Sequence, residues 1–185
     1  MPFRSGSVSY ARFKTIGDAP KAATQEVLDA LADNVISESA LLAVETQFGW
    51  TTGVHLYDTN FDRDTVVVGP CLLLAMRLDT NKVPAEIKRA YRAMAESARA
   101  QDSVTGFISR REKREAAEEV EERCRQDLST GVHRRSKLLP VCWDLERGLV
   151  FAPAFGEASS SALMDLFHAT FDCRLEPLSA GSVAL

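Results

Sequence analysis

The chain has 185 residues, of which 45% are hydrophobic and 26% charged, and it carries a formal net charge of −4 at pH 7. A chain of this length and composition is typical of a globular protein with one domain and an appendage. It contains no apolar run near the roughly 18 residues of a membrane-spanning helix, and its first residues lack the apolar core of a secretion signal, so we expect a cytoplasmic protein with no membrane partner.

The N-terminal part of the sequence predicts a strand, a helix and two further strands. Residues Ser7–Ile16 alternate between apolar and polar side chains, as in a half-buried strand. Asp18 is a suitable N-cap for a helix with Pro20 in its first turn. The apolar face of this helix recurs at helical spacing, through Ala23, Val27, Leu28, Leu31 and Val35. Short strands are expected at Leu41–Thr46 and Val54–Tyr57.

The most apolar part of the chain is Thr65–Leu78. Its two apolar runs do not alternate, which is the pattern of a strand covered on both faces. Gly69 and Pro70 separate the runs and indicate a break or bulge. We therefore expect a central strand here.

Pro84 opens a segment with the spacing of an amphipathic helix. Its apolar stripe consists of Ile87, Ala90, Tyr91, Met94, Ala95 and Ala98. Lys88, Arg92 and Arg99 project together from the other side. The pattern predicts a helix that docks on the core through its stripe and turns a basic face to solvent.

A second, highly charged helix is expected to begin after Ser109, which with Glu112 forms a capping box, and to end near Leu128. Its apolar content is one narrow line of residues, Ala116, Val120, Cys124 and Leu128. Charged residues four positions apart should pair along its surface: Arg111 with Glu115, Arg114 with Glu118, Glu119 with Arg123, and Glu121 with Arg125. The helix therefore depends on its own surface as much as on a core.

The C-terminal part predicts a basic loop over Ser129–Lys137, a hairpin of Leu138–Asp144 and Gly148–Pro153, a helix after Gly156, and an edge strand at Arg174–Leu178. The order of elements indicates an α+β fold with a mostly antiparallel sheet and flanking helices. We expect residues 1–80 and 138–185 to form the core domain and residues 81–137 to be inserted in it as a projecting two-helix arm.

No pattern in the sequence indicates catalysis, a metal or a cofactor. The four cysteines are far apart without a C-x-x-C pair, and the three histidines lack metal-ligand spacing. There is no nucleophile elbow and no glycine-rich phosphate loop. Asp58, Asp62 and Asp64 do not follow the pattern of a calcium loop. We therefore expect a protein that is not an enzyme, with buried thiols.

The charge of the chain is divided. Residues 80–137 contain 14 Lys and Arg against 10 Asp and Glu, a net +4, which leaves −8 for the remainder. Basic side chains on one surface bind phosphates through counterion release, without reading base sequence. The candidate nucleic-acid-binding residues are Lys82, Lys88, Arg89, Arg92, Arg99, Arg110, Arg111, Lys113, Arg114, Arg134, Arg135 and Lys137.

Two other interpretations account for the same segment. Mixed charge keeps a helical hairpin soluble without any partner. Alternatively, the apolar line from Ala116 to Leu128 seats a partner helix, which predicts a homo-oligomeric interaction module without DNA binding.

Several stretches in order resemble a known family: Phe48-Gly49-Trp50, Leu72–Asp79, Lys82–Ala90, Arg110–Leu128, Asp144–Val150 and Leu163–Phe171. Their order and spacing are similar to the N-terminal portion of the recombination-associated protein RdgC family. The resemblance implies sequence-independent binding of double-stranded DNA by a homodimer that closes into a positively lined ring, without enzyme activity. It also implies a place on the nucleoid and a role in restraining recombinase filaments.

The resemblance assigns roles to particular residues. It matches Lys82, Lys88 and Arg89 to the strand-to-helix junction of the family and Arg135 to a basic residue in the loop before the hairpin. Family members are longer, and the C-terminal part that helps to close their ring lies beyond the region of likeness.

Overall fold

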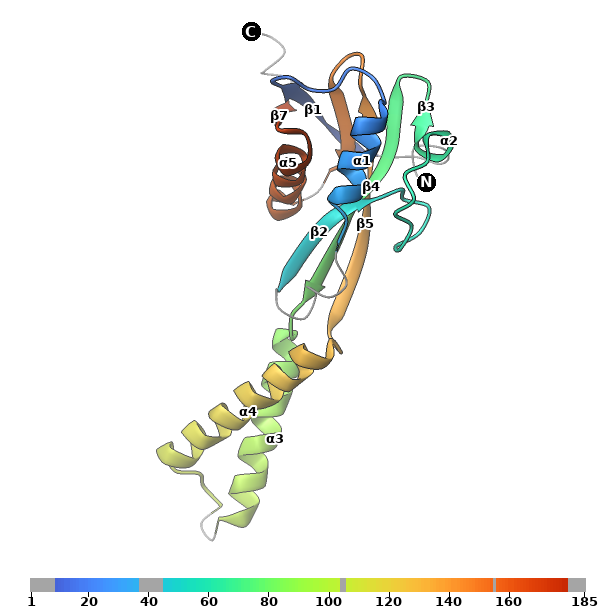
Figure 1. The fold of residues 1–185 in the computed structure, drawn as a ribbon. Coiled ribbons are helices and arrows are strands. Elements are labelled where there is room, and N and C mark those ends of the chain that lie inside the picture. The colour runs from blue at the N-terminus through green and yellow to red at the C-terminus, as the bar shows by residue number, and fades with distance from the viewer. Residues whose placement is uncertain (1–8, 37–44, 104–105, 155, 180–185) are drawn as a thin grey trace. The chain divides into compact units, whose positions relative to one another are not determined.

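A computed structural model of the chain describes residues 9–36, 45–103, 106–154 and 156–179 (Figure 1). The strands are β1 (Tyr10–Ile16), β2 (Thr46–Thr51), β3 (Val67–Val68), β4 (Cys71–Asn81), β5 (Arg134–Asp144), β6 (Leu149–Pro153) and β7 (Arg174–Leu178). The helices are α1 (Gln25–Asp33), α2 (Arg63–Val66), α3 (Ala85–Asp102), α4 (Arg110–Thr130) and α5 (Glu157–Phe171). The protein thus has an α+β fold.

The chain divides into two compact units. The first, called the sheet unit below, takes its described residues from 1–38, 47–79 and 136–185. The second, called the helical unit, takes them from 39–46 and 80–135 and contains α3 and α4. The divisions fall after Asp79 and after Arg135, inside the long strands β4 and β5.

The sheet is antiparallel, with the order β2-β4-β5-β6-β1-β7 and with β3 paired only to β4. The expected hairpin is present as β5 and β6, in which Trp143 lies opposite Val150. Gly148 in its turn has φ of 62°, a left-handed conformation that glycine adopts without strain. The first strand lies between β6 and β7, so β1 pairs with segments far away in sequence.

Helices α1 and α5 contribute to one hydrophobic core on a face of this sheet (Figure 1). Trp50 of β2 and Trp143 of β5 are fully buried and pack edge-on against Phe167 of α5, with ring centroids 5.3 and 5.1 Å apart. Edge-to-face aromatic pairs of this kind add stability beyond their buried area. The expected face of α1 is confirmed, since Val27, Leu28 and Leu31 are buried.

Other details of the N-terminal part differ from the sequence prediction. Helix α1 begins after Thr24 rather than after Asp18, because the intervening residues form bends and no helical turn. Val54–Tyr57 is a turn rather than a strand, and its backbone is held by the hydrogen bond from Thr52 N to Asp58 O. The predicted strand at Leu41–Thr46 lies largely outside the described residues, as does the start of the predicted strand at Ser7–Ile16.

The predicted central strand is confirmed for its second apolar run, which lies in β4 between β2 and β5 and is buried at every residue from Leu72 to Arg77. It is wrong for the first run, because Thr65 and Val66 end helix α2 and Val67 and Val68 form the separate strand β3. Its expected break is a turn at Gly69, after which the chain reverses from β3 into β4. The polar residues in β4 are paired, because the Arg77 guanidinium donates to both carboxylate oxygens of Asp79 at 3.0 and 2.6 Å. A bidentate pair satisfies both buried charges, so the strand can carry them inside the protein.

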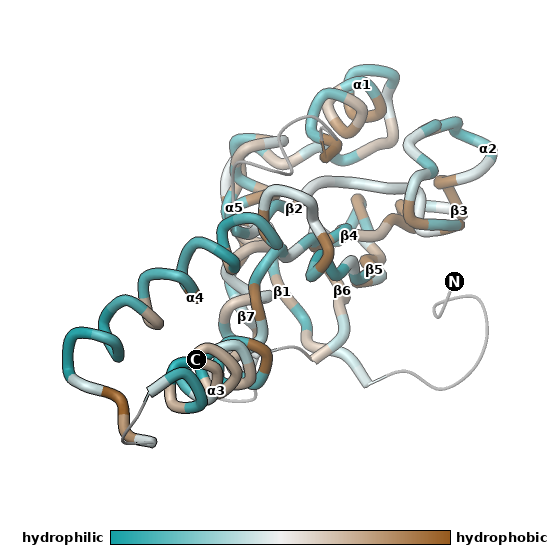
Figure 2. Tube along the Cα trace, turned by 90° about the horizontal axis from the view of Figure 1, so that it is seen from below, coloured by the Kyte–Doolittle hydropathy of each residue, from teal (hydrophilic) through white to brown (hydrophobic). Residues whose placement is uncertain are grey.

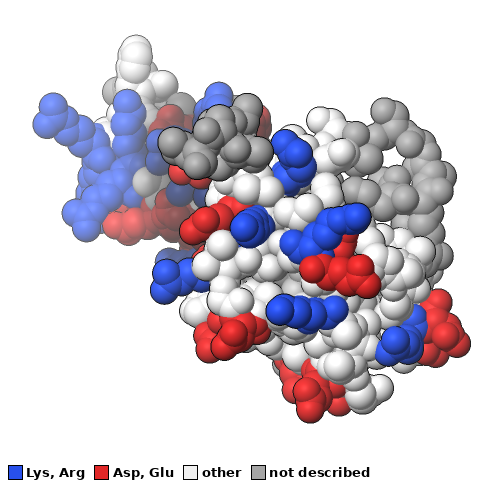
Figure 3. Space-filling view, turned by 90° about the horizontal axis from the view of Figure 1, so that it is seen from above, with Lys and Arg blue, Asp and Glu red and all other residues white. Residues whose placement is uncertain are grey.

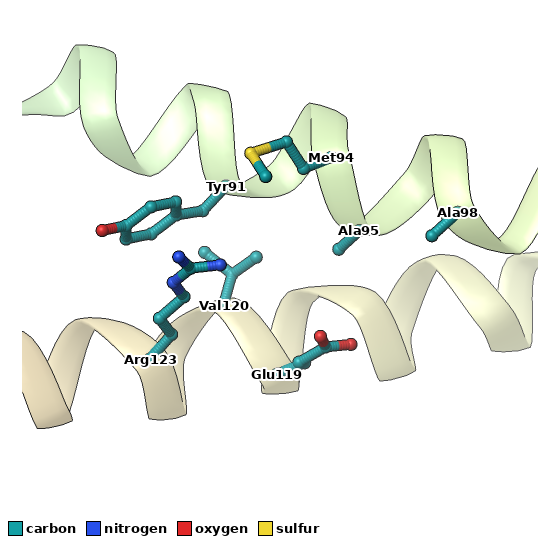
Figure 4. Close-up of a pocket in the computed structure, with 7 residues that line it drawn as sticks. All are labelled: Tyr91, Met94, Ala95, Ala98, Glu119, Val120 and Arg123. Atoms are coloured by element: carbon teal, nitrogen blue, oxygen red, sulfur yellow. The ribbon is translucent and has the colours of Figure 1, made fainter.

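Helices α3 and α4 pack against each other as an antiparallel hairpin (Figure 4). The capping box of Ser109 and Glu112 starts α4 as expected, and Gly131 ends it with φ of 70°. Ala116, Val120 and Cys124 are buried along α4. The prediction that α3 docks on the core is wrong, because no residue of α3 is buried. In Figure 2, α4 is hydrophilic over most of its length, while α3 carries more apolar positions.

Candidate nucleic-acid interface

Four predicted site residues lie together where β4 leads into α3: Lys82, Lys88, Arg89 and Arg92. We call them the junction cluster. Lys88, Arg89 and Arg92 line a hollow of about 230 Å³ with Ala85. Lys82 and Lys88 line a second hollow, of about 370 Å³, that also includes Ala85. The cluster surrounds the N-terminal turns of α3, whose exposed backbone N–H groups favour anions.

Two members of the junction cluster are paired with glutamates. Lys88 forms an ion pair with Glu121 of α4, and Arg89 bonds Glu86 at 3.3 Å within the first turns of α3. Lys82 and Arg92 make no ion pair with any residue that the structure describes. Lys88 and Arg89 therefore each have a glutamate partner, whereas Lys82 and Arg92 have none at ion-pair distance among the described residues, although Arg92 helps to lower the pKa of Glu121.

Arg99, near the other end of α3, does not belong to this cluster. Its guanidinium bonds Glu119 of α4 at 3.0 Å, and only 25% of its side chain is exposed. The prediction that Lys88, Arg92 and Arg99 form a solvent-facing basic face on α3 is therefore wrong for Arg99 and Lys88, which both reach across to α4. Tertiary packing of a charged helix has turned two of the three cations toward glutamates.

A second group of cations occupies the first turns of α4: Arg110, Arg111, Lys113 and Arg114. We call it the α4-start cluster. The predicted pairs of Arg111 with Glu115 and of Arg114 with Glu118 are confirmed, at 2.9 and 3.0 Å. Arg110 and Lys113 have no ion-pair partner among the described residues. Cations at a helix N-terminus oppose the helix dipole, so an external anion here would relieve a local repulsion.

The remaining candidates lie in a strand and not in the expected loop. Helix α4 continues to Thr130, and β5 begins at Arg134, so Arg134, Arg135 and Lys137 are strand residues. Arg135 and Lys137 are exposed and fall on the same face of β5, since side chains two apart in a strand point the same way. Arg134 is half-buried and has polar contacts of its own.

The other two predicted pairs on α4 are wrong. Glu119 and Glu121 bond Arg99 and Lys88 of α3, while Arg125 bonds Glu122 at 3.1 Å. Arg123 instead lies over the ring of Tyr91, with its guanidinium carbon 4.0 Å from the ring centroid (Figure 4). A surface cation–π contact of this kind contributes about 0.5–1 kcal/mol.

A polar cluster not foreseen from the sequence joins the two helices at the same end. Tyr91 Oη donates to Asp127 Oδ2 at 2.8 Å, and His133 Nε2 lies 3.0 Å from the same oxygen. These contacts lower the pKa of Asp127, first through Tyr91 and then through His133. His133 is thus engaged by a carboxylate and is not merely solvated. The cluster fixes the register of α3 against α4 beside the junction cluster.

This arrangement predicts acid sensitivity of the helical unit. Folding lowers the pKa of the Asp127 carboxyl below its ordinary value of 3.8, so the ionised carboxylate stabilises the folded protein at any pH above 3.8. This stabilisation is lost as the pH falls from 3.8 through the pKa of Asp127 in the folded protein. We expect stability to fall more steeply with acidification below about pH 4 in the wild type than in Asp127→Asn. Urea unfolding followed by circular dichroism at several pH values measures this.

Asp102→Asn, at the exposed end of α3, is the matched control for that measurement. It removes a carboxylate from the same hairpin without touching Tyr91 or His133. If Asp102→Asn flattened the acid dependence as much as Asp127→Asn does, the polar cluster would not be its source.

On the face of the molecule seen in Figure 3, Lys and Arg side chains in the foreground lie among Asp and Glu side chains. Within the described ranges, no group of three or more His, Cys, Asp or Glu side chains is arranged to hold a metal ion. No helix in these ranges is both long and apolar enough to cross a membrane.

The two cationic clusters are therefore the strongest candidates for a binding surface, and they have to be interpreted from their own geometry. In comparisons with known proteins, no protein-family model and no curated protein matches this chain.

Proposed function

We propose that this chain is a non-enzymatic protein that binds double-stranded DNA without sequence preference, as its resemblance to the RdgC family implies. The observation that carries the proposal is the placement of cations at two levels of one helical hairpin, the junction cluster and the α4-start cluster. We further propose a homodimer on the nucleoid, with a recombinase as its functional counterpart.

The spacing of the clusters suits a duplex. Lys88 bonds Glu121, which lies seven residues beyond Arg114 and eleven beyond Arg110 along α4, a rise of about 10–16 Å at 1.5 Å per residue. Over about 16 Å of its axis, B-form DNA presents roughly nine phosphate charges. Cations at both ends of such a span can contact the same duplex, while the paired Arg99 and Glu119 between them contribute no net charge.

The glutamate partners do not prevent such binding. Exposed ion pairs contribute only about 0–1 kcal/mol and are screened by salt, so a phosphate can replace the glutamate at a similar cost. Arg111, Arg114 and Arg89 all have side chains more than two-thirds exposed and can turn toward a ligand. Tyr91, the aromatic residue on these turns, is already engaged by Arg123 and Asp127, which favours a duplex over a stacked single strand.

Fluorescence anisotropy with a labelled duplex tests the proposal. We expect binding at low salt whose affinity falls steeply with added salt, with a slope that reflects about four to six phosphate contacts. Duplexes of unrelated sequence should bind equally well. Absence of binding at low salt, or an affinity that does not respond to salt, would contradict it.

A single change should strengthen binding. In Glu121→Gln the carboxylate that occupies Lys88 is removed, so Lys88 becomes available to phosphate and one repulsive charge is lost. We expect duplex affinity to rise by roughly threefold to tenfold and the salt slope to increase by about one. Glu146→Gln, in the exposed β5–β6 turn, makes the same change in net charge and is the control. An equal gain in both variants would show that only net charge matters.

A second candidate function is self-association through the helical unit without DNA. Met94 of α3 is 60% exposed and Phe107 is 82% exposed, which is unusual for large apolar side chains. The version predicted from sequence, in which the line from Ala116 to Leu128 seats a partner, is not available because α3 already covers the start of that line.

Light scattering without DNA distinguishes the two candidates. Self-association through the apolar groups should survive moderate salt and should be weakened in Met94→Ser, whereas DNA binding through the clusters should not change in that variant. A strictly monomeric chain that binds DNA would exclude the second candidate. Val120→Ser with Leu128→Ser would open the hairpin itself and is therefore unsuitable as the test.

A further inference from the structure

Two of the four cysteines, which are 71 residues apart in sequence, meet in the sheet unit. Cys71 begins β4 and Cys142 lies near the end of β5, the neighbouring strand. The two thiols lie near enough that each shifts the pKa of the other, and both residues are partly exposed. The other two cysteines, Cys124 and Cys173, are buried at separate places. The expectation of scattered, buried thiols is therefore wrong for this pair.

The register of the two strands determines how these thiols meet. Leu145 N donates to Pro70 O at 3.1 Å at one end, and Thr80 Oγ1 contacts Arg135 O at 3.5 Å at the other. Both contacts fit one antiparallel register, which places Cys71 directly opposite Asp144. Cys142 is two residues from Asp144 on the same face, so Cys71 and Cys142 are diagonal neighbours.

Diagonal placement disfavours a disulfide. Diagonal residues on one face of an antiparallel pair have Cβ atoms roughly 7 Å apart. A disulfide requires a Cβ separation of about 4 Å, which these strands could reach only by moving their backbones. Two carbon–sulfur bonds directed toward each other would nevertheless bring the sulfur atoms to roughly 3.5–4 Å, in agreement with the effect of each thiol on the pKa of the other.

The nearest carboxylate is already occupied. Asp144 accepts hydrogen bonds from Arg147 N and from Arg147 Nη1, each at 3.0 Å. The site therefore offers two soft sulfur donors and no available third ligand among the described residues. A divalent zinc ion, which takes four ligands, does not suit it. A thiophilic element that needs only two adjacent thiolates as ligands does suit the site.

We propose that Cys71 and Cys142 form a two-thiol binding site for monosubstituted trivalent arsenicals. Arsenic in such a compound is pyramidal and holds both sulfur atoms on one side, at about the separation that the strand register gives for these two thiols. The reaction is a condensation without redox change: an aryl arsenoxide in its hydrated form, with two hydroxyl groups on arsenic, gains two As–S bonds. Both As–O bonds break, and the two thiol protons leave with the hydroxyl groups as two molecules of water.

The state of the thiols sets the rate of this capture. Burial raises the pKa of the Cys71 thiol, and burial together with the adjacent Cys71 raises the pKa of Cys142 to about 12. At Cys71 the neighbouring Cys142 thiol opposes burial and lowers the pKa, while Asp144 and Glu146 raise it and Arg147 lowers it. Since the thiolate is the nucleophile, both groups are largely protonated at neutral pH, and capture should accelerate as pH rises.

The test uses the full reduced chain and phenylarsine oxide. Intact-mass spectrometry is expected to show one adduct that has lost both thiol hydrogens, and maleimide labelling followed by peptide mapping should show Cys71 and Cys142 protected together in the wild type. The adduct should be removed by a small dithiol and resist an excess of a monothiol, as a two-point attachment requires. Cys71→Ser and Cys142→Ser should each lose the adduct.

Cys124→Ala, in the helical unit, is the control and should retain the adduct. Protection of Cys124 or Cys173 in the wild type in place of the strand pair, or an adduct that persists in either single serine variant, would overturn the proposal, as would the absence of any adduct. Rapid formation of a Cys71–Cys142 disulfide with a small-molecule disulfide oxidant would show that the diagonal register is wrong and would also overturn it. The peptide mapping uses the wild-type chain, so it tests the proposal even if a variant folds poorly.

Discussion

Replacement of both Lys82 and Arg92 by glutamine is expected to weaken duplex binding by roughly tenfold to a hundredfold near 100 mM salt, the largest effect on binding that we expect from two substitutions. These are the two members of the junction cluster without a glutamate partner among the described residues. Each neutral replacement removes one phosphate contact and its released counterion, so the slope of log affinity against log salt should fall by about two. Anisotropy titrations across a salt series measure both quantities.

The matched control is Arg12→Gln with Lys14→Gln. Both residues are exposed on one face of β1 in the sheet unit, and the pair changes net charge by the same amount. The control should leave the salt slope nearly unchanged. Equal losses in the two double variants would mean that the chain responds to total charge and that the junction cluster has no special role.

Gly49→Ala is expected to destabilise the sheet unit by about 3 kcal/mol or more, as overpacking against an unyielding neighbour does. A Cβ at this position would lie 2.6 Å from Ile36 N, 2.8 Å from Val35 C and 2.9 Å from Asn34 O, all of them backbone atoms. The same contact is held by the hydrogen bond from Trp50 N to Asn34 O at 2.9 Å. The end of α1 would therefore have to move away from β2. The midpoint of urea unfolding measures the change.

Gly156→Ala provides the comparison, because a Cβ there meets no atom within 4 Å and the backbone φ of −67° suits any residue. Its cost should be only about 1 kcal/mol, which is the loss expected when alanine replaces glycine as N-cap without a steric clash. Similar midpoints for Gly49→Ala and wild type would show that α1 and β2 are not in the close contact described above.

The elements that could be predicted from the sequence are those with local signals. The capping box at Ser109, the glycine turn of the β5–β6 hairpin and the spacing of α5 each lie within a few residues of the element they define. The start of α1 was misplaced because Asp18 and Pro20 have the chemistry of a helix start without the turn that follows. The local helix propensity of these residues is overridden there, because the chain must bend to connect β1 to α1.

The candidate site was only partly predictable for a related reason. A sum of charges along the chain identifies residues 80–137 as basic but cannot show which cations face glutamates on the other helix, as Lys88 and Arg99 do. That information depends on the rotation of α3 against α4. A hint was available: Tyr91 and Asp127 are the polar residues at the apolar seam, and their pairing fixes this rotation.

The contact between Cys71 and Cys142 could not be predicted from the sequence, because strands that are neighbours in the sheet but distant in the chain produce no recognisable spacing of residues. Only the register of β4 against β5, which depends on both long strands, brings Cys71 to Cys142.

The position of β1 between β6 and β7 has a consequence for biosynthesis. The strand of residues 10–16 leaves the ribosome well before its two neighbours, residues 149–153 and 174–178. Closing such a long loop is entropically costly and slow, whereas α3 and α4 need only each other and a short connection. We expect the helical hairpin to form during translation, while the first strand remains unpaired until nearly the whole sheet has been synthesised. During that interval the strand's exposed edge is a natural substrate for a chaperone.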